Sequence, residues 1–127
     1  MSYKAFVSST VKDIDLARDL AQRLEGAGIK VNAVDKAAAS GEVISTKIKR
    51  ALTEADEVFV ILTQESLDNS NLMFEIGAAS SLRKRITPIV VGLEPGELPS
   101  IIRNLKYVRY PDVGKYIEGL ERQAKAA

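Results

Sequence analysis

The sequence predicts an α/β fold in which strands and helices alternate along one domain. Residues 58–62 are continuously apolar and rich in β-forming side chains, which is typical of a parallel strand covered on both faces. On either side of this run, strand-like segments alternate with segments whose apolar residues recur at helical spacing. A chain of 127 residues with 46% hydrophobic residues is close to the common size of a domain with one core. We therefore expect a single domain over residues 1–127.

The individual elements follow from changes in this periodicity. The predicted strands cover residues 3–7, 29–34, 58–62, 86–91 and 107–110. Residues 10–13 form a capping-box pattern before the first helix, which Gly26 and Gly28 are expected to end. Further helices follow the second and third strands, and the last helix begins near Val113. Because such alternation builds parallel sheets through right-handed crossovers, we expect a flavodoxin-like, doubly wound, five-stranded parallel sheet with helices on both faces.

The charge and hydropathy of the chain exclude several classes of partner. Eighteen basic and seventeen acidic residues leave a net charge of +1, which is not the strong positive field of a nucleic-acid-binding protein. The apolar run at 58–62 is too short to span a bilayer, and the polar start of the chain lacks the core of a signal peptide. We expect no nucleic acid, no membrane and a cytoplasmic location.

The chain contains neither cysteine nor histidine, and this narrows the possible chemistry. Disulfides, thiolate nucleophiles, the usual zinc sites and imidazole bases are excluded, so no metal site and no bound cofactor are expected. Carboxylates, hydroxyls, amides, Lys, Arg and Tyr remain. This composition favours a reaction that needs little proton transfer.

Polar side chains follow two strands that neighbour each other in the predicted sheet. The first strand ends in Ser8, Ser9 and Thr10, and the third ends at Thr63, before the polar residues 68–71. Ligands of doubly wound folds bind in the crevice at the carboxyl ends of such strands. Free amides at the start of the first helix would favour an anionic group such as a diphosphate. We therefore expect a binding site in this crevice.

Glu75 is the most informative residue near this crevice. It lies in an otherwise apolar helical run beyond the buried strand, and Leu72, three residues before it, excludes a capping box. Each feature alone also fits an ordinary role: Ser8 to Thr10 as a helix cap, 68–71 as a turn, and Glu75 as an exposed acid near a helix start. Together in one crevice they favour a site.

These residues resemble the TIR domain, the Toll/interleukin receptor type of domain, in its short prokaryotic form. The resemblance spans nearly the whole chain, and the order of its pieces is more specific than any one of them. The pieces are residues 5–9 on the first strand, 35–42 in the place of the family's BB loop, the 58–62 strand, 69–79 around Glu75, and 87–89. The family fold is the same five-stranded flavodoxin-like sandwich, so the resemblance and the periodicity agree.

The resemblance implies an activity and the residues that perform it. Many TIR domains cleave NAD+ between nicotinamide and ribose, leaving ADP-ribose or a cyclised product, and Glu75 matches their catalytic glutamate. NAD+ would then be the substrate, with Ser8, Ser9, Thr10, Asp35, Thr63 and Asn71 as candidate contacts. The 35–42 loop would move over the nucleotide or touch a neighbouring copy, because family members often act when TIR domains stack. Such a chain would fit defence or signalling, with a downstream effector protein as a partner.

One departure from the family pattern keeps other functions open. NAD+-cleaving relatives commonly carry Trp four residues before the glutamate, whereas this chain has Asn71 there and no Trp anywhere. The alternatives are a non-catalytic module that assembles with other TIR domains, and a transferase acting on the N-glycosyl bond of a nucleotide.

Overall fold

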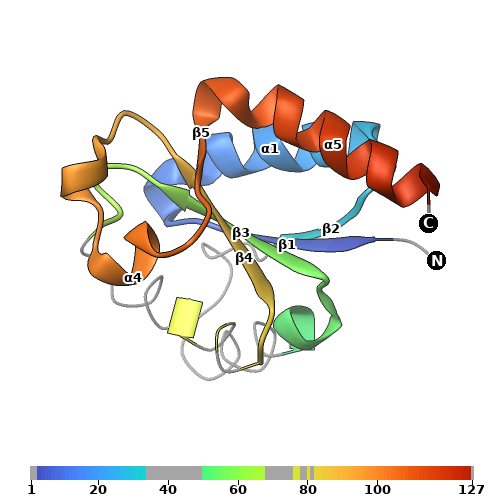
Figure 1. The fold of residues 1–127 in the computed structure, drawn as a ribbon, viewed down its shortest axis with the longest axis horizontal. Helices are drawn as coiled ribbons and strands as arrows, with labels where there is room; N and C mark the ends of the chain where they lie inside the picture. Colours follow the sequence, from blue (N-terminus) through green and yellow to red (C-terminus); the bar gives the residue numbers. More distant parts are fainter. Residues whose placement is uncertain (1–2, 34–49, 68–75, 78–79, 81, 127) are drawn as a thin grey trace.

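The computed structural model describes residues 3–33, 50–67, 76–77, 80 and 82–126, and a five-stranded parallel sheet lies at its centre (Figure 1). The sheet order is β2-β1-β3-β4-β5, and each neighbouring pair is parallel. The strands are β1 (Lys4–Ser8), β2 (Lys30–Ala33), β3 (Glu57–Leu62), β4 (Arg85–Val90) and β5 (Val108–Arg109). This order confirms the predicted flavodoxin-like α/β fold.

Helices cover both faces of the sheet. Their bounds are α1 (Ile14–Gly26), α4 (Ser100–Arg103) and α5 (Val113–Ala126), with single 3-10 turns at η1 (Val11–Asp13), η2 (Pro95–Glu97) and η3 (Tyr110–Asp112). Figure 1 shows α1 and α5 side by side over one face, with α4 on the other. The predicted loop at 35–42 lies outside the described residues, as does the first part of the helix expected after β2, whereas residues 50–54 of that helix are helical as expected.

Strand β3 forms the centre of the core, and all six of its residues are buried. Successive side chains of a strand point to opposite faces. Phe59 and Ile61 therefore pack with α1 and α5, whereas Val58, Val60 and Leu62 pack on the other side with residues such as Leu52 and Ile102. Each such side chain contributes about 2 kcal/mol on burial. The continuously apolar run thus predicted the most buried strand correctly.

The two ends of α1 differ in how well the sequence predicted them. At its carboxyl end, Gly28 has a φ of +84°, and its N–H donates to the carbonyl of Glu25 at 3.0 Å while Ile29 donates to Leu24 at 3.0 Å. This Schellman pattern agrees with the predicted glycine stop. At the other end, α1 begins at Ile14, and Asp13 at its N-cap makes no side-chain capping hydrogen bond. The expected capping box is therefore wrong, because Asp13 has other partners.

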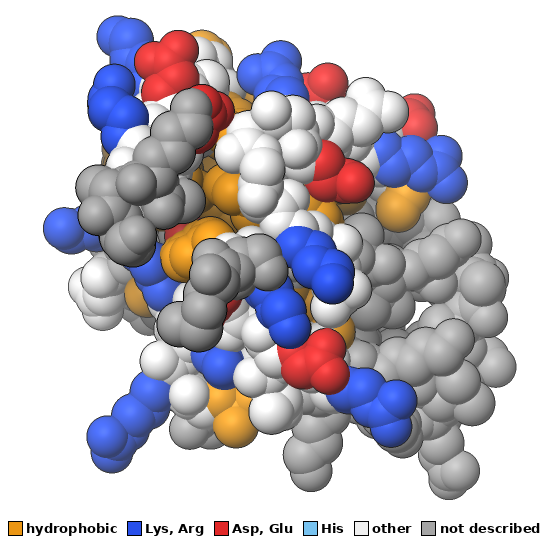
Figure 2. All heavy atoms as spheres, turned by 90° about the vertical axis from the view of Figure 1, so that its right-hand side faces the viewer, with side chains coloured by type: hydrophobic (Ala, Val, Ile, Leu, Met, Phe, Trp, Pro, Cys, Tyr) orange, Lys and Arg blue, Asp and Glu red, His pale blue; other side chains and the backbone are white. Residues whose placement is uncertain are grey.

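Both chain ends lie at the same end of the molecule, because α5 runs back toward the amino ends of the strands, where β1 starts (Figure 1). Figure 2 shows this end with Lys and Arg side chains interspersed among Asp and Glu, without a broad area of one sign on its described part. That mixture disfavours a nucleic-acid interface here. Within the described ranges, every helix is too short or too polar to cross a membrane.

Candidate functional site

The carboxyl ends of β1 and β3 meet, as the strand order predicted. The two strands are hydrogen-bonded neighbours, with Ser8 opposite Val60 in the register. Ser8, Ser9 and Thr10 at the end of β1 are all buried, and Thr63 directly follows β3. The structure therefore brings together four of the predicted contact residues. Contact between these four residues and a substrate stays a prediction.

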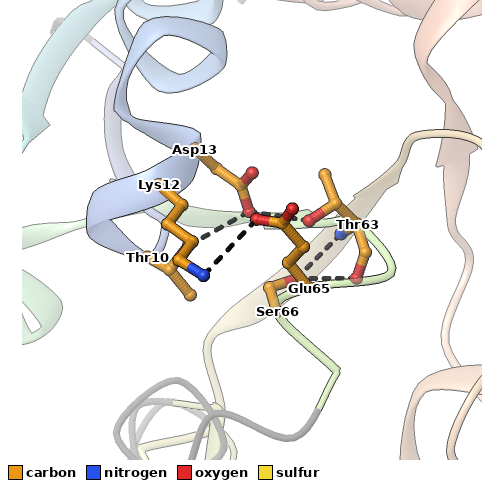
Figure 3. Close-up of polar contacts among 6 residues, drawn as sticks. All are labelled: Thr10, Lys12, Asp13, Thr63, Glu65 and Ser66. Atoms are coloured by element: carbon orange, nitrogen blue, oxygen red, sulfur yellow. Dashed lines mark hydrogen bonds and ion pairs between the residues drawn. The ribbon is translucent and has the colours of Figure 1, made fainter.

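A buried carboxylate joins the two strand ends (Figure 3). The side chain of Asp13 accepts a hydrogen bond at Oδ2 from the hydroxyl of Thr10 at 3.1 Å and another from the hydroxyl of Thr63 at 2.9 Å. Asp13 is 7% exposed, so these bonds form largely away from water. A carboxylate in such a position needs partners, because burying an unpaired charge is costly. The two hydroxyls provide them and link β1 to β3.

The turn after β3 is held by a third hydroxyl. Ser66 Oγ accepts from the backbone N–H of Thr63 at 2.8 Å and donates to the Thr63 carbonyl at 3.1 Å, while the Ser66 N–H donates to the same carbonyl at 3.1 Å. Ser66 is fully buried. Nearby, Lys12 Nζ lies 4.0 Å from Glu65 Oε2 in an exposed ion pair (Figure 3). The turn at 63–66 is thus fixed from within and tied to Asp13.

The hydrogen bonds at this junction decide what the hydroxyls can offer to a ligand. A hydroxyl has one proton to donate and two lone pairs that accept. Thr10 and Thr63 donate to Asp13, and Ser9 donates to the carbonyl of Thr10 at 3.1 Å. Toward a ligand, these three hydroxyls are therefore acceptors. Of the described residues, no three of the His, Cys, Asp and Glu type lie together as metal ligands would.

Three of the predicted site residues belong to the part of the chain that the structure does not describe. Asp35, Asn71 and Glu75 lie outside the described residues, and so does the polar segment 68–71. The next described residue, Ile76, is buried in the core cluster that also contains Leu62. The catalytic role of Glu75 and the contacts of the other two stay predictions.

A second buried carboxylate, which the sequence did not point to, lies at the opposite end of the sheet. Glu57 at the start of β3 is fully buried and accepts hydrogen bonds from the hydroxyls of Tyr3 at 2.6 Å, Thr87 at 2.5 Å and Tyr116 at 2.5 Å. Burial, followed by the hydrogen bond to Glu57, raises the pKa of Tyr116 to about 12 and raises the pKa of Tyr3 as well. The sequence signal was available: Glu57 is two residues from Phe59, on the same buried face.

One surface hollow lies apart from the candidate site. It has a volume of about 590 Å³ and is open to solvent. Residues of β5, η3 and α5 line it together with Tyr107, and none of them was a predicted site residue. We assign it no function.

The comparison with protein families decides the family of this chain. A family model of the TIR domain matches residues 5–123. The chain belongs to the TIR domain family. The match does not distinguish the short prokaryotic form, which stays a prediction. No protein with a curated functional description matches the sequence.

Solved structures agree with this family. The TIR domain of the Toll-related receptor TRR-2 from Hydra magnipapillata is 18% identical, with a TM-score of 0.70, and the match covers 97% of this chain and 94% of that one. The CMP N-glycosidase BcmB of Clostridium botulinum is 21% identical, with a TM-score of 0.68 and coverage of 93% and 98%. The TIR domains of the activated Roq1 resistosome are 17% identical, with a TM-score of 0.62 and coverage of 98% and 77%. At these identities the likeness shows the shared fold.

Proposed function

We propose that this TIR domain hydrolyses or cyclises NAD+, breaking the bond between nicotinamide and ribose, in a defence or signalling system. The observation that carries the proposal is the family match over residues 5–123, combined with the polar junction of β1 and β3 at the ligand-binding end of the sheet. Glu75 is the proposed catalytic residue, by its match to the family position. NAD+ is a substrate here, and no bound cofactor is needed.

The chemistry of NAD+ suits a chain without histidine or cysteine. The C1′–N bond breaks with its electron pair staying on nitrogen, so the cationic ring leaves as neutral nicotinamide and needs no proton. Water then bonds to C1′ and releases one proton, which gives ADP-ribose; attack by an adenine nitrogen of the same molecule would give the cyclic product. Ordinary glycosidases need a second carboxyl group to protonate their leaving group. Here one carboxylate suffices.

The expected contribution of Glu75 can be estimated from electrostatics. A carboxylate about 4 Å from the developing positive charge on the ribose stabilises it by about 4 kcal/mol at an effective dielectric constant near 20, which is roughly a thousandfold in rate. Asn71 stands where relatives commonly have Trp, so base stacking cannot add an indole surface at that position. The proposed activity therefore depends on Glu75 more than on aromatic contacts.

Glu75→Gln is the direct test. We expect nicotinamide release, measured by chromatography on concentrated protein, to fall roughly a thousandfold, because the amide keeps the shape of the side chain and removes its charge. Glu118→Gln is the matched control, since Glu118 is exposed on α5, and its rate should equal that of the wild type. Equal rates in the wild type and Glu75→Gln, or no release from protein that has assembled, would refute the proposal.

A second candidate is an N-glycosidase that acts on a pyrimidine nucleotide. The observation that favours it is the likeness to the CMP N-glycosidase, which covers nearly all of both chains, together with Asn71 in the place of Trp. Cytosine is a poorer leaving group than nicotinamide, because it departs without a proton only as an anion. Release of cytosine from CMP, with NAD+ left intact, would favour this candidate. A nucleotide N-glycosyl transferase would instead exchange the base with free bases.

Self-association is the remaining part of the proposal. The Roq1 structure is that of an activated resistosome with its TIR domains, so domains of this fold occur in assemblies. We propose that copies of this chain associate through TIR–TIR contacts, with a downstream effector protein responding to the product. Activity per molecule should then rise with protein concentration. If the chain associates but cleaves no nucleotide, the non-catalytic assembly module is the better description.

A further inference from the structure

We infer that Asp13 is a positioning residue of the candidate site: it locks the loop after β1 to the turn after β3 and turns the hydroxyls of Thr10 and Thr63 into acceptors. The inference concerns the same site as the proposed function, and its kinetic test rests on that function. Its structural test does not.

The geometry of the link supports this role. One carboxylate oxygen, Asp13 Oδ2, accepts from two hydroxyls that are far apart in sequence, at 3.1 Å from Thr10 and 2.9 Å from Thr63. Thr10 and Asp13 are both buried, at 9% and 7% exposure, so water competes weakly for these bonds. Hydrogen bonds to a charged acceptor are about twice as strong as neutral ones. Asp13 is therefore a rigid bridge between two strand ends.

The bridge acts on the segment that leads to the proposed catalytic residue. Thr63 begins the turn that Ser66 closes through three hydrogen bonds, so the turn moves as a unit with Thr63. The chain continues from this turn to Glu75, nine residues after Ser66. Small displacements of a catalytic group can lower a rate about a hundredfold. Releasing Thr63 from Asp13 should therefore affect catalysis without removing any reacting group.

The direction of the hydrogen bonds adds a prediction about specificity. An ionised carboxylate can only accept, so the protons of both threonine hydroxyls point to Asp13. Their remaining lone pairs suit donors such as ribose hydroxyls or a carboxamide N–H, and oppose phosphate oxygens. The Asp13 charge at the start of α1 also compensates the helix dipole there, which disfavours a second anion. We thus expect this junction to bind the ribose side of a nucleotide rather than its diphosphate.

Thr63→Val tests the bridge by removing one hydroxyl while keeping the shape of the side chain. We expect kcat for nicotinamide release to fall by about tenfold to a hundredfold, because the catalytic segment is displaced, and KM to rise by a smaller factor, because one acceptor for the ribose is lost. Thr63→Ser restores the hydroxyl and should restore at least half of the wild-type kcat. A merely destabilising change would leave the kcat of the folded protein unchanged below its melting temperature.

Thr87→Val is the matched control, because Thr87 also donates its hydroxyl to a buried carboxylate, but at the other end of the sheet. It should lower stability and leave kcat and KM within about twofold of the wild type when both proteins are folded. If Thr63→Val and Thr87→Val lower kcat equally, or if Thr63→Val leaves it unchanged, the positioning role is refuted.

Hydrogen exchange of the protein without ligand separates this inference from the proposed function. In Thr63→Val, the amides of residues 10–13 and 63–67 should exchange at least about fivefold faster, while those of β4 stay unchanged. If the wild type releases no nicotinamide, the proposed function fails, yet faster exchange in both segments still supports the bridge. Unchanged exchange in both segments refutes the bridge whatever the activity. Should Thr63→Val fail to fold, Thr10→Val removes the other hydroxyl and is read in the same way.

Discussion

Two buried carboxylates stand at opposite ends of the same sheet, and they differ in how many elements they join. Glu57, at the amino end, accepts hydroxyls from residues before β1, in β4 and in α5. Asp13, at the carboxyl end, joins only the loop after β1 to the turn after β3. The rings of Tyr116 and Phe59 also pack in a T-shaped arrangement, with ring centroids 6.1 Å apart and planes at 83°. The amino end therefore holds the layers together, while the carboxyl end fixes two loops.

The largest expected effect is on stability at the amino end. Glu57→Ala leaves three hydroxyls without their acceptor and should lower the free energy of unfolding by about 3 kcal/mol. Asp13→Ala leaves two hydroxyls without their acceptor and should lower it by about 1–2 kcal/mol. For a domain of this size, the Glu57 change corresponds to a fall of roughly 10 °C in Tm. Urea unfolding followed by circular dichroism measures both, with Glu118→Ala as the exposed control.

The activities should fall in the reverse order. Asp13→Ala should lose nicotinamide release, whereas folded Glu57→Ala should keep it. Equal losses of stability and of activity in the two variants would break the comparison between the ends of the sheet.

Alkaline pH should lower the stability of the protein by weakening the hydrogen bonds at the amino end of the sheet. The pKa of Tyr116 is raised to about 12 in the folded protein, from an ordinary value near 10. A raised pKa contributes stability below the unfolded value and loses it as the pH rises toward the folded value. Between pH 10 and 12, the wild type should therefore lose about 1 kcal/mol more stability than Tyr116→Phe, since solvent screens part of the interaction of this half-exposed phenol. Parallel pH curves for the two proteins would contradict this assignment.

The smallest effect is expected at the exposed ion pair beside Asp13. Lys12 and Glu65 lie 4.0 Å apart with side chains 76% and 63% exposed. Lys12→Ala should change stability by less than about 0.5 kcal/mol, because exposed pairs gain little from their attraction. Thermal unfolding at low and high salt measures it. A loss comparable to that of Asp13→Ala would show that the ion pair, and not the buried carboxylate, joins the two loops.

The fold could be predicted from the sequence because it follows from short-range periodicity. The apolar run at 58–62 and the alternation around it were sufficient for the strand order, and this order brought Ser8 and Thr63 to adjacent strand ends. The family was recognised from the order of several short segments. The catalytic role of Glu75 stays a prediction.

The partners of the two carboxylates could not be predicted in the same way. The capping-box pattern at residues 10–13 gave Asp13 an ordinary role at a helix start, but Thr63, fifty residues away, offers its hydroxyl only in the folded sheet. Glu57 directly precedes the apolar run at 58–62 and lies outside the predicted strand. Its donors come from three distant segments that only the packing of α5 and β4 brings together.

The path of α5 back to the amino ends of the strands has a practical consequence. Because both termini lie at the end of the sheet that carries Glu57, a tag or a surface linker attached at either terminus is held away from the carboxyl ends of β1 and β3. Immobilised protein should therefore present the carboxyl ends of β1 and β3 to the solution, whichever terminus is anchored.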